Sequence, residues 1–177
     1  MKVHVITASK HESTREVGEA IAQRLRDRGH SAVAEAAEGL GELASGEPVV
    51  LGSPIYMGRW RNEARAVVAR LADEPPGRPI WLFTLGPLGD PPKPDDAGPE
   101  EEVERFAAER AIDHTLFNGK LDRSLLNRRE RLAVRAVKAP EGDFRDWPAI
   151  GAWADQISDA LFERAAQRGE AEAHVAG

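Results

Sequence analysis

The stretch TASKHESTREVGEAIAQRL, residues 7–25, sets the pattern of the whole chain. It follows a short apolar run, residues 2–7, which is typical of a buried strand. A helix is predicted from about Thr14 to Arg28, and Gly29 is placed to end it. The apolar residues of this helix fall on one stripe at helical spacing: Val17, Ile21 and Leu25.

The same alternation continues along the chain and predicts an α/β fold with a parallel sheet covered on both faces. Further strands are predicted at Ser31–Ala36, Pro48–Ser53, Pro79–Leu85 and His114–Phe117. Further helices are predicted at Arg61–Ala72, Glu100–Arg110, Ser124–Val137 and Trp147–Ala166. We expect one domain over residues 1–168 and a frayed tail over residues 169–177. Three tryptophans are predicted to lie in the core: Trp81, Trp147 and Trp153.

Composition narrows the function classes. The chain has 177 residues. Its formal net charge of −6 argues against nucleic-acid binding, and the absence of cysteine excludes thiol chemistry. Redox chemistry would therefore need a bound cofactor. No apolar stretch approaches the roughly 20 residues that span a bilayer. The opening MKVHVIT is too short for a signal peptide, so a cytoplasmic location is the expectation.

Ligands of such sheets bind beyond the carboxyl ends of the strands. Three loops follow strands at that edge: Ala8–Thr14, Pro54–Trp60 and Gly86–Pro94. We expect these loops to meet and to form the binding site.

The first loop is rich in groups that bind a phosphate. Ser9, Ser13 and Thr14 supply hydroxyls, Lys10 supplies positive charge, and His11 could donate to an oxygen. They precede a helix N-terminus, whose N–H groups and dipole favour anions. The motifs GxxxxGK[ST] and GxGxxG are absent, which disfavours ATP and dinucleotides. An alternative is a capping box, with Ser13 as N-cap and Glu16 at the third helical position.

Three segments resemble known loops. TASKHEST resembles the FMN-phosphate loop of flavodoxins, VVLGSPIYMGRW the second flavin loop and LFTLGPLGDPPKP the third. FNGKLDRSLL and APEGDFRDWPAI extend the match over most of the chain, toward the flavodoxin-domain family that includes menaquinone-dependent protoporphyrinogen oxidase. The resemblance implies a flavodoxin-like, doubly wound five-stranded parallel sheet of order 2-1-3-4-5, and FMN as cofactor.

Glu12 departs from the family pattern, because flavodoxin-type loops usually carry glycine there. A positive φ at this position would cost a non-glycine residue roughly 1–2 kcal/mol. The carboxylate would also repel a phosphate, unless solvent screens it or Lys10 offsets it. We expect weakened FMN affinity, with complete loss of the site as the alternative.

The second and third loops would enclose the flavin ring. Tyr56, Met57 and Trp60 could provide faces for it, and Gly58 would let the backbone approach it. Trp60 could instead pack in the core, and the glycines of the third loop could simply form turns. The predicted cofactor-binding residues are Ser9, Lys10, His11, Glu12, Ser13, Thr14, Pro54, Ile55, Tyr56, Met57, Gly58, Trp60, Thr84, Leu85, Gly86, Pro87 and Gly89.

A basic stretch, residues 120–138, interleaves lysine and arginine with leucine and valine. A basic amphipathic helix can lie on an anionic membrane surface or meet an acidic partner, and the ordinary alternative is a solvated helix face over a core stripe. The resemblance implies a redox partner or a quinone acceptor, met at the membrane by at most peripheral contact.

Function is expected to be FMN-dependent redox chemistry. The resemblance implies an oxidase of the protoporphyrinogen type, with a porphyrinogen as substrate. The second hypothesis is a small electron carrier. Such a carrier would have an acidic face, and the acidic stretch PDDAGPEEE fits that expectation. A flavin-free interaction or regulatory protein is a third, because of Glu12. No side chain stands out as catalytic, and no histidine spacing predicts a metal site. Both monomer and homodimer remain open.

Overall fold

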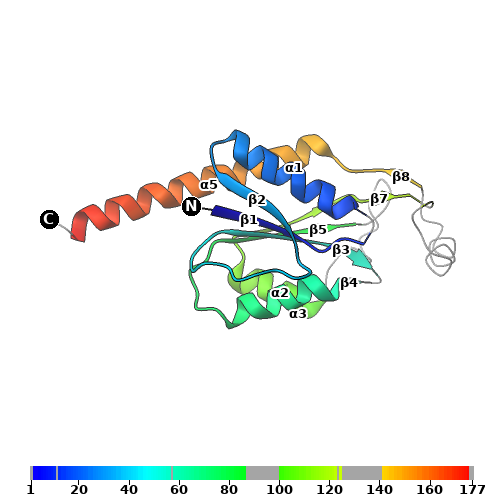
Figure 1. Ribbon diagram of the computed structural model, residues 1–177, viewed down its shortest axis with the longest axis horizontal. Coiled ribbons are helices and arrows are strands. Elements are labelled where there is room, and N and C mark those ends of the chain that lie inside the picture. Colours follow the sequence, from blue (N-terminus) through cyan, green and yellow to red (C-terminus); the bar gives the residue numbers. More distant parts are fainter. Residues whose placement is uncertain are drawn as a thin grey trace.

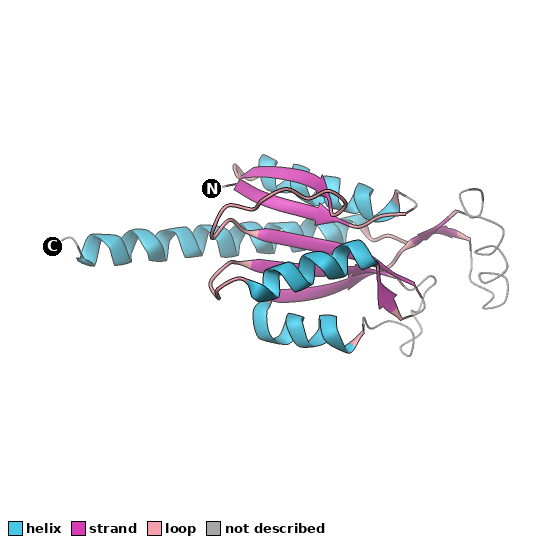
Figure 2. Ribbon diagram, turned by 60° about the horizontal axis from the view of Figure 1, so that its bottom comes forward, coloured by secondary structure: helices cyan, strands magenta, loops and turns pink. Residues whose placement is uncertain are grey.

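A parallel sheet forms the centre of the protein (Figure 2). The computed structural model describes residues 2–10, 12–56, 58–86, 100–122, 124 and 141–175. The five parallel strands are β1 (Lys2–Thr7), β2 (Ser31–Ala36), β3 (Val49–Tyr56), β5 (Ile80–Leu85) and β6 (Asp113–Phe117). Their order is β2-β1-β3-β5-β6. Because β5 and β6 are the fourth and fifth parallel strands along the chain, the predicted order 2-1-3-4-5 is confirmed.

Helices cover both faces of this sheet (Figure 1). They are α1 (Ser13–Asp27), α2 (Asn62–Asp73), α3 (Glu101–Arg110) and α5 (Trp147–Val175). α1 and α5 lie on one face and α2 and α3 on the other, and each pair closes its own hydrophobic cluster against the sheet. The stripe predicted on α1 is fully buried: Val17, Ile21 and Leu25 are each 0% exposed.

Strand β5 supplies both clusters, and all six of its residues are buried. Trp81 and Phe83 point toward α1 and α5, while Ile80 and Leu82 point toward α2 and α3. This alternation follows from the two-residue period of a strand. Trp81 is therefore a core residue, as predicted.

Gly52 makes room for the Phe83 ring. The two residues are partners in the β3–β5 register. A Cβ atom on Gly52 would lie 2.0 Å from Cζ of Phe83, far inside any van der Waals contact. The ring therefore fills the space where a side chain would stand.

Polar contacts fix α5 in place. Arg24 of α1 donates from Nε and a terminal nitrogen to the two carboxylate oxygens of Asp155, at 2.8 Å each. The indole nitrogen of Trp153 donates to Asp113 of β6 at 2.6 Å. Trp153 is core, as predicted, but the same prediction for Trp147 is wrong. That side chain is 41% exposed, because it lies before the buried stripe of α5 begins.

Several elements lie outside the predicted pattern. Arg59–Trp60 forms β4, which pairs antiparallel with β3, and Lys120–Leu121 (β7) pairs with Gly142–Asp143 (β8). α5 continues to Val175 and so includes residues 169–175 of the expected tail. Apart from its first residue, the predicted helix Ser124–Val137 lies outside the described residues. Among the described helices, none is both long and apolar enough to cross a membrane.

Candidate functional site

The first two predicted loops meet at the carboxyl edge of the sheet, and the third begins beside them. The backbone N–H of Ala8, after β1, donates to the carbonyl of Gly52 in β3 at 3.0 Å. Pro54 at the end of β3 is the register partner of Leu85 at the end of β5. The N–H of Gly86, after β5, donates to the Phe117 carbonyl at 2.9 Å. The parallel register thus gathers segments that are far apart in sequence.

Glu12 occupies the N-cap position of α1 and has a left-handed backbone conformation. Its φ is +66°, and it is the only non-glycine with positive φ among the residues that the structure describes. Its side chain makes no capping hydrogen bond, but its carboxylate forms an ion pair with Arg15, one turn along. The strained backbone expected at this position is therefore present, and the carboxylate, 56% exposed, is compensated by an arginine.

The capping-box alternative for the first loop is wrong. The Ser13 hydroxyl is buried and has no hydrogen-bond partner in the described part of the chain. Glu16 does not reach back to the N-cap, because its carboxylate instead accepts from Arg145 at 2.6 Å. An unsatisfied buried hydroxyl costs about 1–3 kcal/mol, and an acceptor that reached this group would recover that cost.

The other residues of this loop differ in how far they are exposed to solvent. Thr14 is buried at 1% exposure, Ser9 is half-buried and Lys10 is exposed. His11 lies outside the described residues.

The second loop is a β-hairpin. β3 runs on to Tyr56, so Pro54, Ile55 and Tyr56 belong to a strand, and β4 returns beside it with Tyr56 opposite Arg59. Gly58 has φ +72°, and a positive φ is what the tight turns between antiparallel strands require. Met57 and the side chain of Tyr56 lie outside the described part. Their predicted role beside the flavin stays a prediction.

Trp60 lies inside the protein. Its side chain is 2% exposed and packs in the cluster under α2 and α3. Its backbone N–H donates to the Glu100 carboxylate at 2.8 Å, and its indole nitrogen donates to the Thr84 hydroxyl at 2.9 Å. This geometry favours the core alternative for Trp60 over a face for the flavin.

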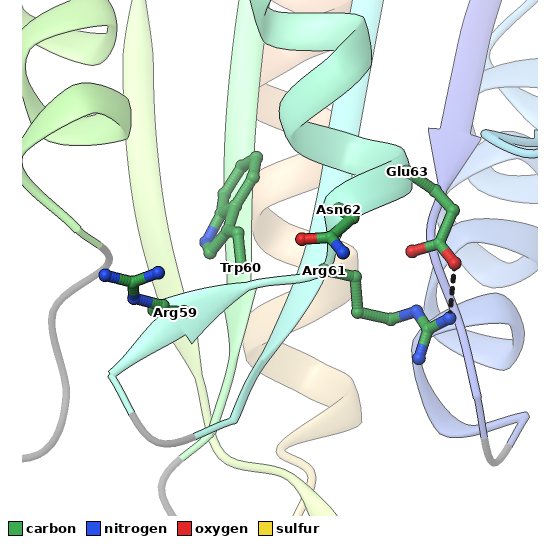
Figure 3. Close-up of a pocket in the computed structure, with 5 residues that line it drawn as sticks. All are labelled: Arg59, Trp60, Arg61, Asn62 and Glu63. Carbon is green, nitrogen blue, oxygen red and sulfur yellow. Dashed lines mark hydrogen bonds and ion pairs between the residues drawn. The ribbon is translucent and has the colours of Figure 1, made fainter.

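A cavity of about 230 Å³ opens at this hairpin and the start of α2 (Figure 3). Arg59 and Arg61 extend to opposite sides of Trp60, and Arg61 reaches Glu63 at 2.6 Å. Arg61 also donates its backbone N–H to the Ser53 hydroxyl at 3.0 Å, which anchors the beginning of α2 to β3.

The third loop begins at Gly86, with φ +147°. A Cβ atom there would lie 2.8 Å from Cγ2 of Ile55, so glycine allows the second and third segments to approach. Thr84 and Leu85 are buried members of β5, at 0% and 4% exposure. Pro87 and Gly89 lie outside the described residues.

His114 extends the hydrogen-bond chain from Trp60. Its Nε2 lies 2.8 Å from the Thr84 hydroxyl oxygen. The indole N–H of Trp60 can only donate, so Thr84 accepts that bond, while the direction of the bond between Thr84 and His114 depends on the His114 tautomer. Burial lowers the pKa of His114 below its ordinary value, and burial also lowers the pKa of His30.

Stability is therefore expected to fall as pH is lowered from about 7.5 to about 5.5. In this range the unfolded chain binds protons, with an ordinary histidine pKa of 6.5, while the folded chain, with its lowered histidine pKa, binds fewer. Each histidine changes the free energy of unfolding by at most about 1.4 kcal/mol per pH unit. Urea unfolding at the two pH values measures the effect. His114→Gln should flatten the dependence, and an unchanged slope in that variant would contradict the assignment.

The first loop fits the phosphate of FMN, the cofactor that the flavodoxin resemblance implies. Within the part of the chain that the structure describes, α1 begins without a side-chain cap, Ser13 offers a buried hydroxyl without a partner, and the Glu12 carboxylate is paired. Helix N-termini of this kind bind anions through free N–H groups. The residues that could hold a phosphate are Ser9, Lys10, Ser13 and Thr14.

Sequence reasoning missed three residues of this region. Arg15 could have been found from its spacing to Glu12, since residues three apart share a helix face. Neither Arg145 nor His114 carries a local signal, because their partners lie far away in sequence.

Comparisons with known proteins agree with the observed fold. The sequence model of the family described as Flavodoxin domain matches residues 4–147. A flavodoxin from Streptococcus pneumoniae TIGR4 aligns with a TM-score of 0.59 and 14% identity, over 93% of this chain and 99% of that one. A flavodoxin from the domain Archaea aligns with a TM-score of 0.51 and 18% identity, over 78% and 99%.

A longer protein has the same fold over part of its length. Rubredoxin oxygen:oxidoreductase from Desulfovibrio gigas aligns with a TM-score of 0.59 and 12% identity, covering 93% of this chain and 37% of that one. At these identities the solved structures show the fold alone. No curated protein sequence matches the chain.

Proposed function

Since this chain belongs to the flavodoxin-domain family, we propose that it binds FMN without a covalent bond and transfers electrons through it. The observation that carries the proposal is the buried Ser13 hydroxyl at the uncapped start of α1, which has no partner in the described structure. A phosphate oxygen is the acceptor that this position favours.

The residues have separable roles in this proposal. Ser9, Ser13 and Thr14 donate hydroxyl hydrogen bonds to the phosphate, together with the first N–H groups of α1. Ile55, Gly58 and Gly86 border the space for the ring. When bound, FMN supplies a ring system that takes up and releases electrons, and the protein positions it and tunes its potential.

Titration with FMN tests the proposal. Quenching of FMN fluorescence and the shift of its absorption bands should report saturable binding with one FMN per chain. Ser13→Ala should weaken the affinity about tenfold, since a hydrogen bond to a charged group is worth about 1.5–3 kcal/mol. Ser31→Ala, at an exposed position in β2, is the matched control. Absence of binding by the wild type would refute the proposal and would favour the flavin-free interaction or regulatory protein that Glu12 kept open.

Two finer functions follow from FMN binding. An electron carrier is supported by the neighbours named flavodoxin, while oxidation of a porphyrinogen rests on the sequence resemblance alone. The carrier and the oxidase are distinguished by what reduces the FMN-loaded protein under anaerobic conditions. One sample is given a flavodoxin reductase and the other is given protoporphyrinogen. Reduction by the reductase alone would support the carrier, and turnover of protoporphyrinogen with a quinone would support the oxidase.

A further inference from the structure

Arg145 is an arginine enclosed by partners. Its side chain is 3% exposed and stacks over the Trp147 ring, with Cζ 4.5 Å from the ring centroid. It donates to Asp143 from Nε at 2.8 Å and from a terminal nitrogen at 2.6 Å. These bonds raise the pKa of Arg145 further and lower the pKa of Asp143, so both groups stay charged.

The remaining donor of Arg145 reaches the first turn of α1. Its other terminal nitrogen lies 2.6 Å from the Glu16 carboxylate and 3.4 Å from the Ser13 carbonyl oxygen. Arg145 thus connects the segment before α5 to the residue that carries the unpartnered hydroxyl. Along the chain, Arg145 lies 129 residues after Glu16 and 132 residues after Ser13.

Charge explains what this contact can do. Two carboxylates lie at the start of α1, and both would oppose an anion bound there. Glu12 is paired with Arg15, and Glu16 is paired with Arg145. The pair with Arg145 is the more enclosed of the two, because the arginine is 3% exposed, compared with 54% for Arg15. Solvent therefore screens it less.

We propose that Arg145 is a positioning residue for the anion site of the first loop. It holds the Ser13 carbonyl and, with a charge that it shares with Asp143, offsets part of the negative charge of Glu16, so that the N-terminus of α1 accepts a phosphate. The inference rests on the proposed function, since it assigns the phosphate of FMN to this loop. Arg145 acts through Ser13 and Glu16 and need not touch the ligand.

The test compares two flavins that differ by the phosphate. FMN and riboflavin are titrated into the wild type, Arg145→Ala and Arg145→Lys. Arg145→Ala should lose about fivefold in FMN affinity and change riboflavin affinity less than about twofold, because only FMN carries the charge. Arg145→Lys should recover part of the loss, since it keeps the charge but not the forked geometry. An equal loss for both flavins would overturn the proposal.

Two further variants separate this role from general stability. Arg24→Ala breaks an arginine–aspartate pair between α1 and α5, away from the loop, and should leave the ratio of FMN to riboflavin affinity unchanged. Glu16→Gln in the Arg145→Ala background should restore most of the FMN affinity. Failure of that restoration would overturn the charge argument. If Arg145→Ala does not fold, Arg145→Lys and the single variant Glu16→Gln replace it in the test. Arg145→Lys should then bind FMN more weakly than the wild type, and Glu16→Gln should bind it more tightly.

Failure of the proposed function is distinguishable from failure of this inference. If the wild type binds no FMN, inorganic phosphate is used as the probe and thermal unfolding as the readout. Stabilisation that is largest for the wild type, smaller for Arg145→Lys and smallest for Arg145→Ala would support the role of Arg145. Equal stabilisation of all, or of none, would overturn it.

Discussion

Replacing Gly52 with alanine is expected to lower the free energy of unfolding by about 3 kcal/mol. The added Cβ would lie 2.0 Å from the Phe83 ring, which is 0% exposed and packed between β3 and α5. Rings of Trp153 and Phe117 stand at centroid distances of 6.1 and 6.2 Å from that ring, so Phe83 has little room to move. Overpacking of a close-packed core costs about 1–3 kcal/mol, and this contact is at the severe end.

Urea unfolding followed by circular dichroism measures this effect. Gly41→Ala is the matched control, because its Cβ would meet nothing within 4 Å. Adding Phe83→Leu to Gly52→Ala should recover part of the loss by making room for the methyl group. A Gly52→Ala variant as stable as the wild type would show that the ring moves aside without cost.

Replacing Glu12 with glycine is expected to tighten FMN binding about tenfold, because it removes a carboxylate at the anion site and releases Arg15 from its pair. Glu12 also adopts a φ of +66°, a backbone conformation that strains a non-glycine residue in the folded chain. Relief of that strain, less the greater chain entropy of glycine, should raise the free energy of unfolding by about 0.5–1 kcal/mol.

Glu12→Gln separates the two contributions. It removes the charge but keeps a side chain at positive φ, so it should tighten FMN binding without the gain in stability. FMN titration and urea unfolding on both variants give the two quantities. Unchanged or weaker FMN affinity in Glu12→Gly would contradict the account of the loop.

The fold could be predicted from the sequence because its signals are local and repeated. The stripe of Val17, Ile21 and Leu25 and the apolar strands specify layers that pack in only a few ways. The hairpin of β3 and β4 was missed because Arg59–Trp60 is too short to show a strand period. Its one signal was Gly58, whose positive φ permits the turn.

The place of the candidate loops was predictable, but their side-chain contacts only in part. The carboxyl-edge rule, which depends on topology alone, correctly predicted that the first two loops and the start of the third lie at one edge of the sheet. Ser13 fits a capping box by spacing, but its expected partner Glu16 is taken by Arg145, which no local pattern could reveal. Trp60 likewise fits either a flavin face or the core, and only the bonds to Thr84 and Glu100 distinguish the two.

The link from Arg145 to Glu16 also orders events during translation. The first turn of α1 leaves the ribosome 129 residues before the arginine that compensates its carboxylate. Until that arginine has been synthesised, the nascent loop carries an acidic side chain without the partner that it has in the folded chain. Under the proposed function, the anion site of the first loop would thus be completed only after the segment before α5 has been made.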